Sequence, residues 1–385
     1  MISWRQCFLQ VAPAPVLTAL RSCWRKYYGF KCGYRGWRAF VRWWLWVVFE
    51  CVRHRQRAVI ICRTGALGDL VCTLPLGEEI RRRHSGRLLV FVTAPAYREI
   101  VLLSRTADLV YVNAAWVYPF TLPTQFKSFG LVEMIYNPRT TDEHNLQTGA
   151  SRHLIEDLAA SCGVIEPAHQ PRLYPSADLI KKTRLAYGLD ANEIGNRWLI
   201  GINGGPSWPV RTWAATNWQK LVNFIHANYN ATIIQFGSNQ GDGSSEFDRL
   251  TGVQSVASRL KAEEIVALVA ACDLVVSIDS GPVHLAGAVG TPVIGLFGPV
   301  KPSFRLPIDS PSVGLVGDVP CQFCHNQTPV GHWVTGCPHD IICMKLLKVQ
   351  SVFEAVKAML VTFNKPADAK LETVPKPRPN YPPKP

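Results

Sequence analysis

A strand that turns directly into a helix stands at residues 274–286, which read LVVSIDSGPVHLA. The run Leu274–Ile278 is short and apolar, as is typical of a strand buried on both faces. Residues 279–282 then open a helix, because Pro282 suits the first turn of a helix. A strand followed at once by a helix is the repeating unit of a parallel α/β sheet.

Short apolar runs alternate with helix-length segments from residue 58 onward, which predicts two parallel α/β halves. In the first half we expect strands at Ala58–Cys62, Leu88–Val92, Leu109–Val112 and Leu131–Tyr136, and helices at Leu70–Arg83, Tyr97–Ser104 and Arg152–Cys162. In the second half we expect strands at Trp198–Asn203, Thr232–Phe236, Leu274–Ile278 and Val293–Phe297, and helices near Ala215–Ala227, Ala262–Ala271 and Val283–Ala288.

The predicted fold class is therefore α/β, with two Rossmann-like, doubly wound domains that face a ligand cleft. We expect these domains at residues 58–166 and 196–363, joined by a proline-rich linker over residues 167–195. Residues 1–57 form a basic amphipathic extension, and residues 364–385 form a tail rich in proline and lysine. The composition of the tail predicts disorder.

The formal net charge of +13 is concentrated at the two ends of the chain. Residues 1–57 carry 11 basic residues and one acidic residue, and residues 364–385 carry five basic and two acidic residues. The body between them has 25 of each and is neutral. Because nucleic acids bind through a basic surplus, this neutral body argues against a nucleic-acid partner.

The extension predicts an amphipathic helix, because apolar residues fall at positions 37, 40, 41, 44, 45, 48 and 52. Arg35, Arg38 and Arg42 share the opposite face, a pattern that suits an anionic membrane surface. The uncharged run Trp43–Phe49 is too short to span a membrane, since a crossing takes about 20 residues. There are two alternatives to membrane contact: the helix packs on the body, or the segment is an artefact of the choice of start codon.

The turn after the first strand, residues 63–69, reads RTGALGD. Its two glycines allow a tight turn whose backbone N–H groups can face an anion. Asp69 stands at the start of the next helix, where a carboxylate serves either as a cap and dipole partner or as a general base. The spacing alone leaves both roles open.

Two further segments suit the binding of a phosphorylated ligand. The amides and dipole at the start of the helix after Asp279 make a phosphate site, and His284 can donate to an oxygen there. Arg211, in the loop between Asn203 and Trp213, can clamp a diphosphate with its planar set of donors. The alternatives are a structural histidine and a solvated loop arginine.

Together these motifs resemble the heptosyltransferases of glycosyltransferase family 9. Gly68-Asp69 and Thr73–Pro75 look like the family's amino-terminal motif, and Asp279–His284, Gly290–Pro292 and Leu296–Pro299 look like its carboxyl-terminal motif. The resemblance covers roughly residues 58–360 and implies a GT-B fold. It also implies inverting transfer of a sugar, usually a heptose from an ADP-activated donor. The implied acceptor is the lipopolysaccharide core or a related lipid-linked glycan, at the cytoplasmic face of the inner membrane.

The resemblance also assigns roles to individual residues. It makes Asp69 the catalytic base and places Thr64 and Gly68 in the acceptor-side loop. It assigns donor binding to Asp279, Ser280, Gly281, His284 and Glu246, and to Arg211, which stands where the family commonly has a lysine. The chain has no Asp-x-Asp motif, so we expect transfer without a metal cofactor. The runner-up function is a non-catalytic, membrane-associated protein that keeps the GT-B shape.

Four of the twelve cysteines cluster near the end of the second half, at Cys321, Cys324, Cys337 and Cys343. Their spacing is compatible with a structural zinc site, although the last interval is wide for a zinc pair. Disulfides and free thiols are the other two possibilities.

Overall fold

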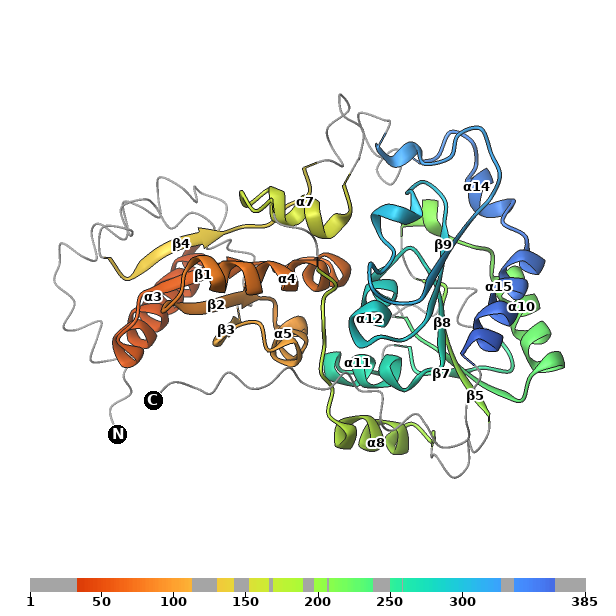
Figure 1. Ribbon diagram of the computed structural model, residues 1–385, viewed down its shortest axis with the longest axis horizontal. Coiled ribbons are helices and arrows are strands. Elements are labelled where there is room, and N and C mark those ends of the chain that lie inside the picture. The colour runs from red at the N-terminus through yellow and green to blue at the C-terminus, as the bar shows by residue number, and fades with distance from the viewer. Residues whose placement is uncertain are drawn as a thin grey trace. The chain divides into compact units, whose positions relative to one another are not determined.

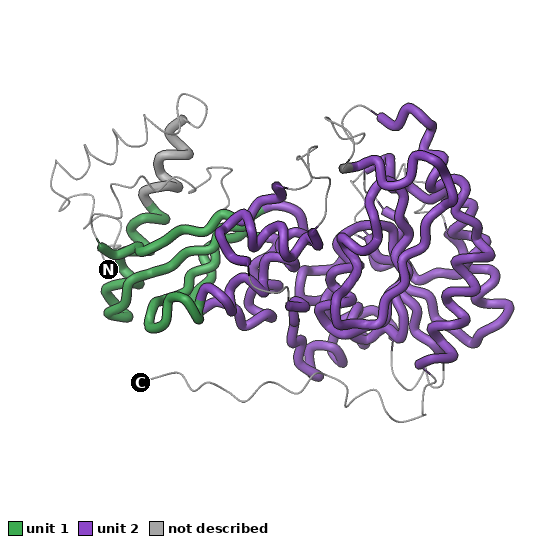
Figure 2. The backbone as a smooth tube through the Cα atoms, turned by 45° about the horizontal axis from the view of Figure 1, so that its top comes forward, with its two compact units in different colours: residues 1–64, 81–95, 108–137 green, residues 65–80, 96–107, 138–385 purple. Residues whose placement is uncertain are grey.

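The computed structural model describes residues 33–112, 130–141, 152–165, 169–189, 197–205, 208–237, 250–257, 259–326 and 336–363. The chain divides into two compact units (Figure 2). Unit 1 comprises residues 1–64, 81–95 and 108–137, and unit 2 comprises residues 65–80, 96–107 and 138–385. The extension before residue 33, the tail after residue 363 and Glu246 lie outside the described residues.

Unit 1 is built on a parallel sheet of four strands in the order β3-β2-β1-β4 (Figure 1). The strands are β1 Ala58–Cys62, β2 Leu88–Thr93, β3 Leu109–Val112 and β4 Val132–Tyr136. Every residue of β1 and β2 is buried, because the central strands of a parallel sheet are covered on both faces. All four predicted strands of this half are confirmed.

Helix α3, Gly33–His54, packs against this sheet and does not stand apart from the body. Trp43, Val47 and Cys51 enter the core with side chains of β1, β2 and β4. The predicted apolar face is wrong for this part of the helix, since Val52 is 65% exposed. Tryptophan and valine occur on several sides of α3, so the sequence offers two apolar stripes and packing selects one.

Unit 2 holds a parallel sheet of six strands in the order β10-β9-β8-β5-β6-β7. Its strands are β5 Trp198–Asn203, β6 Ala231–Gln235, β7 Gln254–Ser255, β8 Leu274–Ile278, β9 Val293–Phe297 and β10 Ser312–Val316. Helices α10, Ala215–Asn228, and α15, Val349–Thr362, share one apolar core with β5, β8 and β9. Helix α12, Gly281–Val289, contacts β8 and β9, and α11, Ala262–Ala271, packs on α12 (Figure 1).

The remaining helices are α4 Leu67–Arg83, α5 Arg98–Ser104, α7 Leu154–Ala160, α8 Ala177–Ala186 and α14 Ile342–Lys345, and short 3-10 turns occur at η2 Pro95–Tyr97, η4 Pro209–Arg211, η6 Pro302–Phe304 and η7 Cys324–Asn326. Helix α8 lies inside the predicted linker and packs on α11. Its start is stabilised by Ser176, whose hydroxyl accepts a hydrogen bond from the Leu179 amide at 3.1 Å.

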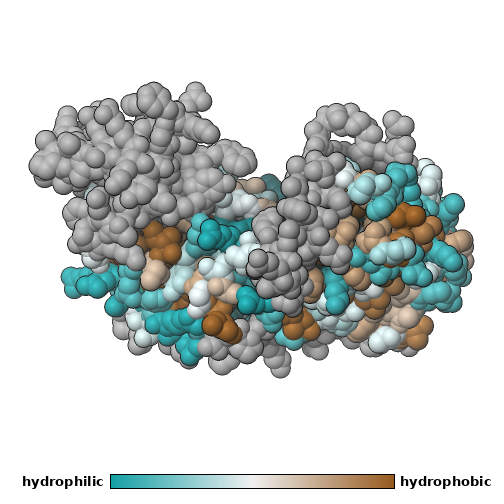
Figure 3. All heavy atoms as spheres, turned by 90° about the horizontal axis from the view of Figure 1, so that it is seen from above, coloured by the Kyte–Doolittle hydropathy of each residue, from teal (hydrophilic) through white to brown (hydrophobic). Residues whose placement is uncertain are grey.

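The predicted α/β class with two doubly wound parallel sheets is confirmed. Strands β7 and β10, at the two edges of the second sheet, were not predicted, and neither was α15, which covers a face of it. Within the described ranges, no helix is both long enough and apolar enough to span a bilayer. On the face seen in Figure 3, apolar side chains lie in small patches among polar ones.

Candidate functional site

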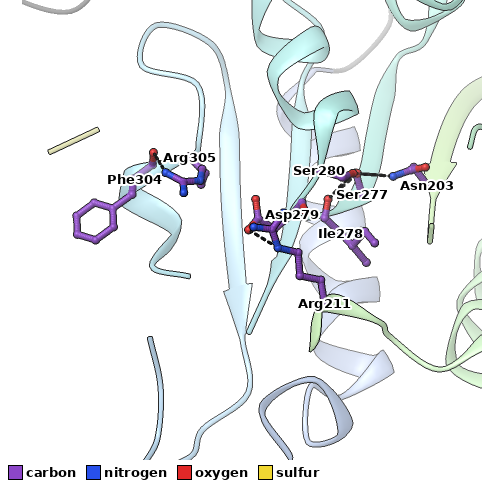
Figure 4. A network of polar contacts seen from close by, with 8 residues as sticks. All are labelled: Asn203, Arg211, Ser277, Ile278, Asp279, Ser280, Phe304 and Arg305. Carbon is purple, nitrogen blue, oxygen red and sulfur yellow. Dashed lines mark hydrogen bonds and ion pairs between the residues drawn. The ribbon is translucent and has the colours of Figure 1, made fainter. Parts of the chain in front are cut away.

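A polar network forms in unit 2 where the neighbouring strands β5 and β8 end. Asn203, the last residue of β5, donates from Nδ2 to Ser280 Oγ at 2.8 Å and to Ser277 Oγ at 3.1 Å (Figure 4). The Ser280 hydroxyl in turn donates to the Ile278 carbonyl at 3.1 Å. Because carboxyl ends of parallel strands lie at one edge of a sheet, residues 77 positions apart meet here.

Arg211 and Asp279 form a buried ion pair beside this network. Arg211 Nε lies 3.3 Å from Asp279 Oδ2, and Arg211 NH1 donates to the Asp279 carbonyl at 3.0 Å (Figure 4). The side chains are 14% and 3% exposed, so water screens their attraction only weakly. The Asp279 carboxylate and carbonyl therefore hold the guanidinium close to the start of α12.

Trp208 stacks on the same guanidinium. Its ring centroid lies 4.5 Å from Arg211 Cζ, within cation–π range, and the residue is 42% exposed. The His325 ring lies nearly parallel to Trp208, with a centroid distance of 6.5 Å. The indole thus holds Arg211 from one side and presents aromatic surface to solvent.

Helix α12 begins at this edge without a cap from its own N-cap side chain. Ser280 is the N-cap residue, but its hydroxyl makes no capping hydrogen bond and serves the Asn203 network. The positive end of the α12 dipole lies here, which favours an anion. Pro282 has no amide hydrogen, and the Val283 amide donates to the Ser280 carbonyl at 3.1 Å.

The two sequence motifs meet through glycines at van der Waals distance. A Cβ added to Gly68 would lie 2.7 Å from His284 Cδ2, and one added to Gly281 would lie 2.8 Å from Leu67 Cδ2. Both distances are shorter than real carbon contacts, so a side chain at either position would push the segments apart. The turn that carries Asp69 therefore touches the start of α12.

His284 lies at this contact as a neutral imidazole. Burial lowers its pKa to about 3, and the nearby charges of His153 and Arg211 act in the same direction. Its Nδ1 lies 3.3 Å from the Cys72 sulfur on α4. The histidine is therefore part of the packed interior and also borders the turn with Asp69.

Residues 142–333 match glycosyltransferase family 9 (heptosyltransferase). This stretch of the chain is therefore similar to the heptosyltransferases of that family. The match spans α7 to β10 and includes Arg211 and the segment from Asp279 to His284. The family resemblance seen in the sequence is confirmed.

Individual relatives of this family are only distantly similar. Lipopolysaccharide heptosyltransferase 2 of Salmonella typhimurium is 27% identical over 161 residues, which are 39% of this chain and 46% of that protein. Lipooligosaccharide heptosyltransferase 2 of Haemophilus influenzae is 30% identical over 152 residues, 37% of this chain and 41% of that protein. The matches therefore span less than half the length of these curated relatives.

Solved structures show the same fold. ADP-heptose LPS heptosyltransferase II of E. coli aligns with a TM-score of 0.58 at 15% identity, covering 80% of this chain and all of that one. Dodecameric iron-containing heptosyltransferase TibC, in complex with ADP-D-β-D-heptose, aligns with a TM-score of 0.61 at 15% identity, covering 80% of this chain and 76% of that one. The GT-B-like α/β architecture of the family is therefore present here.

Asp69 lies within the first turn of α4, two residues after Leu67 where the helix begins. An N-cap role for Asp69 is therefore wrong, because the residue before the helix is Ala66, whose φ of 41° is left-handed. A favourable interaction with the α4 dipole and the role of base both remain compatible with this place. Asp69 is partly exposed, as a base that meets a substrate must be.

Arg305 is a site residue that the sequence analysis missed. It follows the η6 turn after β9 and is buried, and burial lowers its pKa while the charges of Asp69 and Cys72 raise it. A buried cation therefore lies within electrostatic range of Asp69. Its sequence signal is weak, a single arginine after a proline turn in the segment from Pro302 to Arg305.

The sequence analysis also missed Asn203 and Trp208 as site residues. Asn203 ends a strand and Trp208 lies in a loop, and neither side chain carries a charge that would mark it as a ligand-binding residue.

The remaining predicted residues are Thr64 and the four clustered cysteines. Thr64 lies in unit 1, half-buried in the loop after β1. None of the four clustered cysteines is in a disulfide, so the disulfide alternative is wrong. Burial raises the pKa of Cys324 and raises that of Cys343 to about 11, which favours the protonated thiol. Within the described ranges no group of three or more histidine, cysteine, aspartate or glutamate side chains is arranged to hold a metal ion, so structural zinc stays a prediction.

Proposed function

We propose that this chain is an inverting glycosyltransferase that moves a heptose from an ADP-activated donor to the lipopolysaccharide core or a related lipid-linked glycan. The observation that carries the proposal is the contact of Gly68 with His284 and of Gly281 with Leu67. This contact brings the turn that carries Asp69 to the start of α12, the segment that suits a diphosphate. The names of the family relatives support heptose as the sugar and ADP as the nucleotide.

In the proposed reaction, Asp69 accepts the proton of an acceptor hydroxyl as that oxygen attacks the anomeric carbon. An unassisted hydroxyl is a poor nucleophile at neutral pH, so a carboxylate within hydrogen-bond reach accelerates the step. The bond from the anomeric carbon to the diphosphate breaks on the opposite side, which inverts the configuration. Electrons of that bond leave with ADP.

The leaving diphosphate gains negative charge, and three features are placed to stabilise it. Arg211 is held in one orientation by Asp279 and Trp208, so little reorganisation is required when charge develops. The start of α12 adds its dipole and amides. His284 is neutral at physiological pH and so acts as a hydrogen-bonding group.

The test is transfer of heptose from ADP-heptose to purified heptose-deficient lipopolysaccharide, with wild-type protein and Asp69→Asn. We expect the substitution to lower kcat by about 10²- to 10⁴-fold while donor affinity by calorimetry changes less than about threefold. Asp178→Asn, in the first turn of α8, is the matched control. Full activity of Asp69→Asn would overturn its role as base. A wild-type protein that binds no ADP-, UDP- or GDP-sugar would favour the non-catalytic alternative.

We also propose peripheral contact with an anionic membrane at the cytoplasmic face of the inner membrane. Phe49 and Val52 of α3 are exposed and Arg53 follows them, which suits an interfacial helix. Because Trp43 and Val47 belong to the core, the test must leave them in place. We expect Phe49→Ser with Val52→Ser to reduce sedimentation with anionic vesicles and to leave donor affinity unchanged. Unchanged sedimentation would contradict the contact.

A further inference from the structure

Cys72 and His284 form a buried pair whose partners are 212 positions apart in the chain. The Cys72 sulfur lies 3.3 Å from His284 Nδ1, well inside hydrogen-bond distance for sulfur. Cys72 is 1% exposed and packs with Leu154, Ile155 and Leu158 of α7. We therefore expect no water to compete with the thiol for a hydrogen bond to His284 Nδ1.

The opposite edge of the imidazole faces the turn before Asp69. The position that a Cβ on Gly68 would take lies 3.2 Å from His284 Nε2 and 2.7 Å from Cδ2. Nε2 is therefore the nitrogen nearer to the turn, and Nδ1 is the nitrogen nearer to the thiol. The two edges of one ring thus face two different environments.

The ring carries one proton at neutral pH, because burial and the charges of His153 and Arg211 disfavour the imidazolium. Both ring nitrogens of His153 have backbone partners: Nε2 lies 2.8 Å from the Leu306 carbonyl, and Nδ1 accepts from the Ile155 amide at 3.2 Å. A neutral imidazole has one donor and one acceptor nitrogen. Which nitrogen holds the proton decides what the ring offers to the turn.

We propose that Cys72 is a positioning residue for His284: its S–H group donates to Nδ1 and so keeps the imidazole proton on Nε2, beside Gly68 and Asp69. Sulfur is a weak acceptor and an imidazole nitrogen is a strong one, so this direction is the more stable of the two. The proposal rests on the proposed sugar transfer for its catalytic meaning. There, an Nε2–H group offers a donor to oxygen atoms that gain negative charge, whereas an Nε2 lone pair would repel them.

The first test reads the tautomer in the unliganded full chain, without any assay of transfer. Proton–nitrogen correlation spectra of ¹⁵N-histidine-labelled protein distinguish the two neutral tautomers, and His284→Gln assigns the signal. We expect the Nε2–H form in wild type and in Cys72→Ser, whose hydroxyl can replace the thiol as donor. In Cys72→Ala we expect a mixture of tautomers. A wild-type Nδ1–H form, or an unchanged Nε2–H signal in Cys72→Ala, would overturn the proposal.

The second test measures the catalytic consequence. We expect Cys72→Ala to lower kcat about five- to tenfold with a change in donor KM below about twofold, and Cys72→Ser to recover most of kcat. Cys272→Ala is the matched control, since Cys272 is an equally buried thiol that donates to the Leu268 carbonyl and is unrelated to His284. An equal loss of kcat in Cys272→Ala would contradict a specific role.

The two tests separate this inference from the proposed function. If wild type transfers no sugar but shows the Nε2–H signal and its loss in Cys72→Ala, then the positioning role stands and the proposed function fails. If wild type transfers sugar and the tautomer is independent of Cys72, then the positioning role fails alone. Should Cys72→Ala unfold, Cys72→Val keeps the volume and removes the donor, and the same tautomer change is expected.

Discussion

Asp279 and His284 belong to one short motif, yet the structure treats them in opposite ways. Asp279 is paired with Arg211 at 3.3 Å and is almost entirely buried. His284, one turn further on, is buried without a carboxylate partner in the contacts described and is kept neutral. The difference shows that a single strand-to-helix turn provides a charged, rigid site at its start and an uncharged hydrogen-bonding group one turn later.

The largest expected effect comes from removing Asp279, the carboxylate of the buried ion pair with Arg211. Asp279→Ala leaves the Arg211 guanidinium buried without its carboxylate, which costs about 3–5 kcal/mol for a buried pair. We expect the free energy of unfolding, measured in urea, to fall by about that amount. Glu354→Ala removes an exposed carboxylate paired with Lys357 and should change it much less, because water screens an exposed pair. Equal effects would mean that burial of the Asp279 pair carries no special weight.

The contact between the two motifs gives the next effect. Gly68→Ala places a methyl group against the His284 ring, so either the ring or the turn must move. We expect a loss of about 1–3 kcal/mol in unfolding free energy and at least a tenfold loss of transfer. Gly65→Ala is the control, because nothing lies within 4 Å of its added Cβ. Equal losses of stability and transfer in Gly68→Ala and Gly65→Ala would mean that the close approach of Gly68 to His284 is dispensable.

The buried, neutral His284 predicts that the stability of the protein depends on pH. Burial lowers the pKa of His284 to about 3, so the unfolded chain takes up this proton near pH 6.5 and the folded chain does not. Stability is therefore present above pH 6.5 and is lost as the pH falls from 6.5 toward 3, by up to about 1.4 kcal/mol per pH unit. His153, with its own lowered pKa, adds to this slope.

Replacing the histidine isolates its share of that slope. We expect His284→Gln to flatten the fall in unfolding free energy between pH 6.5 and 4.5, measured by urea titration. His226→Gln, at an exposed site on α10, should leave the slope as in wild type. A wild-type slope in His284→Gln would mean that the ring is already protonated in the folded state.

The smallest expected effect concerns Trp208, whose ring stacks on Arg211. Trp208→Ala removes the ring that stacks on Arg211 but leaves its ion pair with Asp279. A partly exposed cation–π contact contributes about 0.5–1 kcal/mol. We therefore expect donor affinity, measured by calorimetry, to fall about two- to fivefold, with Trp208→Phe retaining most of it. A loss beyond about 50-fold would indicate that Trp208 contacts the donor directly.

Local sequence patterns were sufficient for most strands and for the site segments. The run before Asp279 is apolar and is followed by Gly281 and Pro282, and such a boundary is readable without any tertiary contact. They were insufficient for α3, where two apolar stripes compete, and for α8, where a proline-rich start conceals a capped helix. Packing against neighbours decided both.

Taken alone, the sequence determined two parallel α/β halves, the turn with Gly68 and Asp69, and the helix start after Asp279, because each depends on short-range spacing. Only the tertiary structure decided that Gly68 touches His284, that Cys72 faces its Nδ1, and that the Arg305 cation lies near Asp69. These contacts join positions far apart in the chain. They follow from how helices and strands pack in three dimensions, which no local spacing encodes.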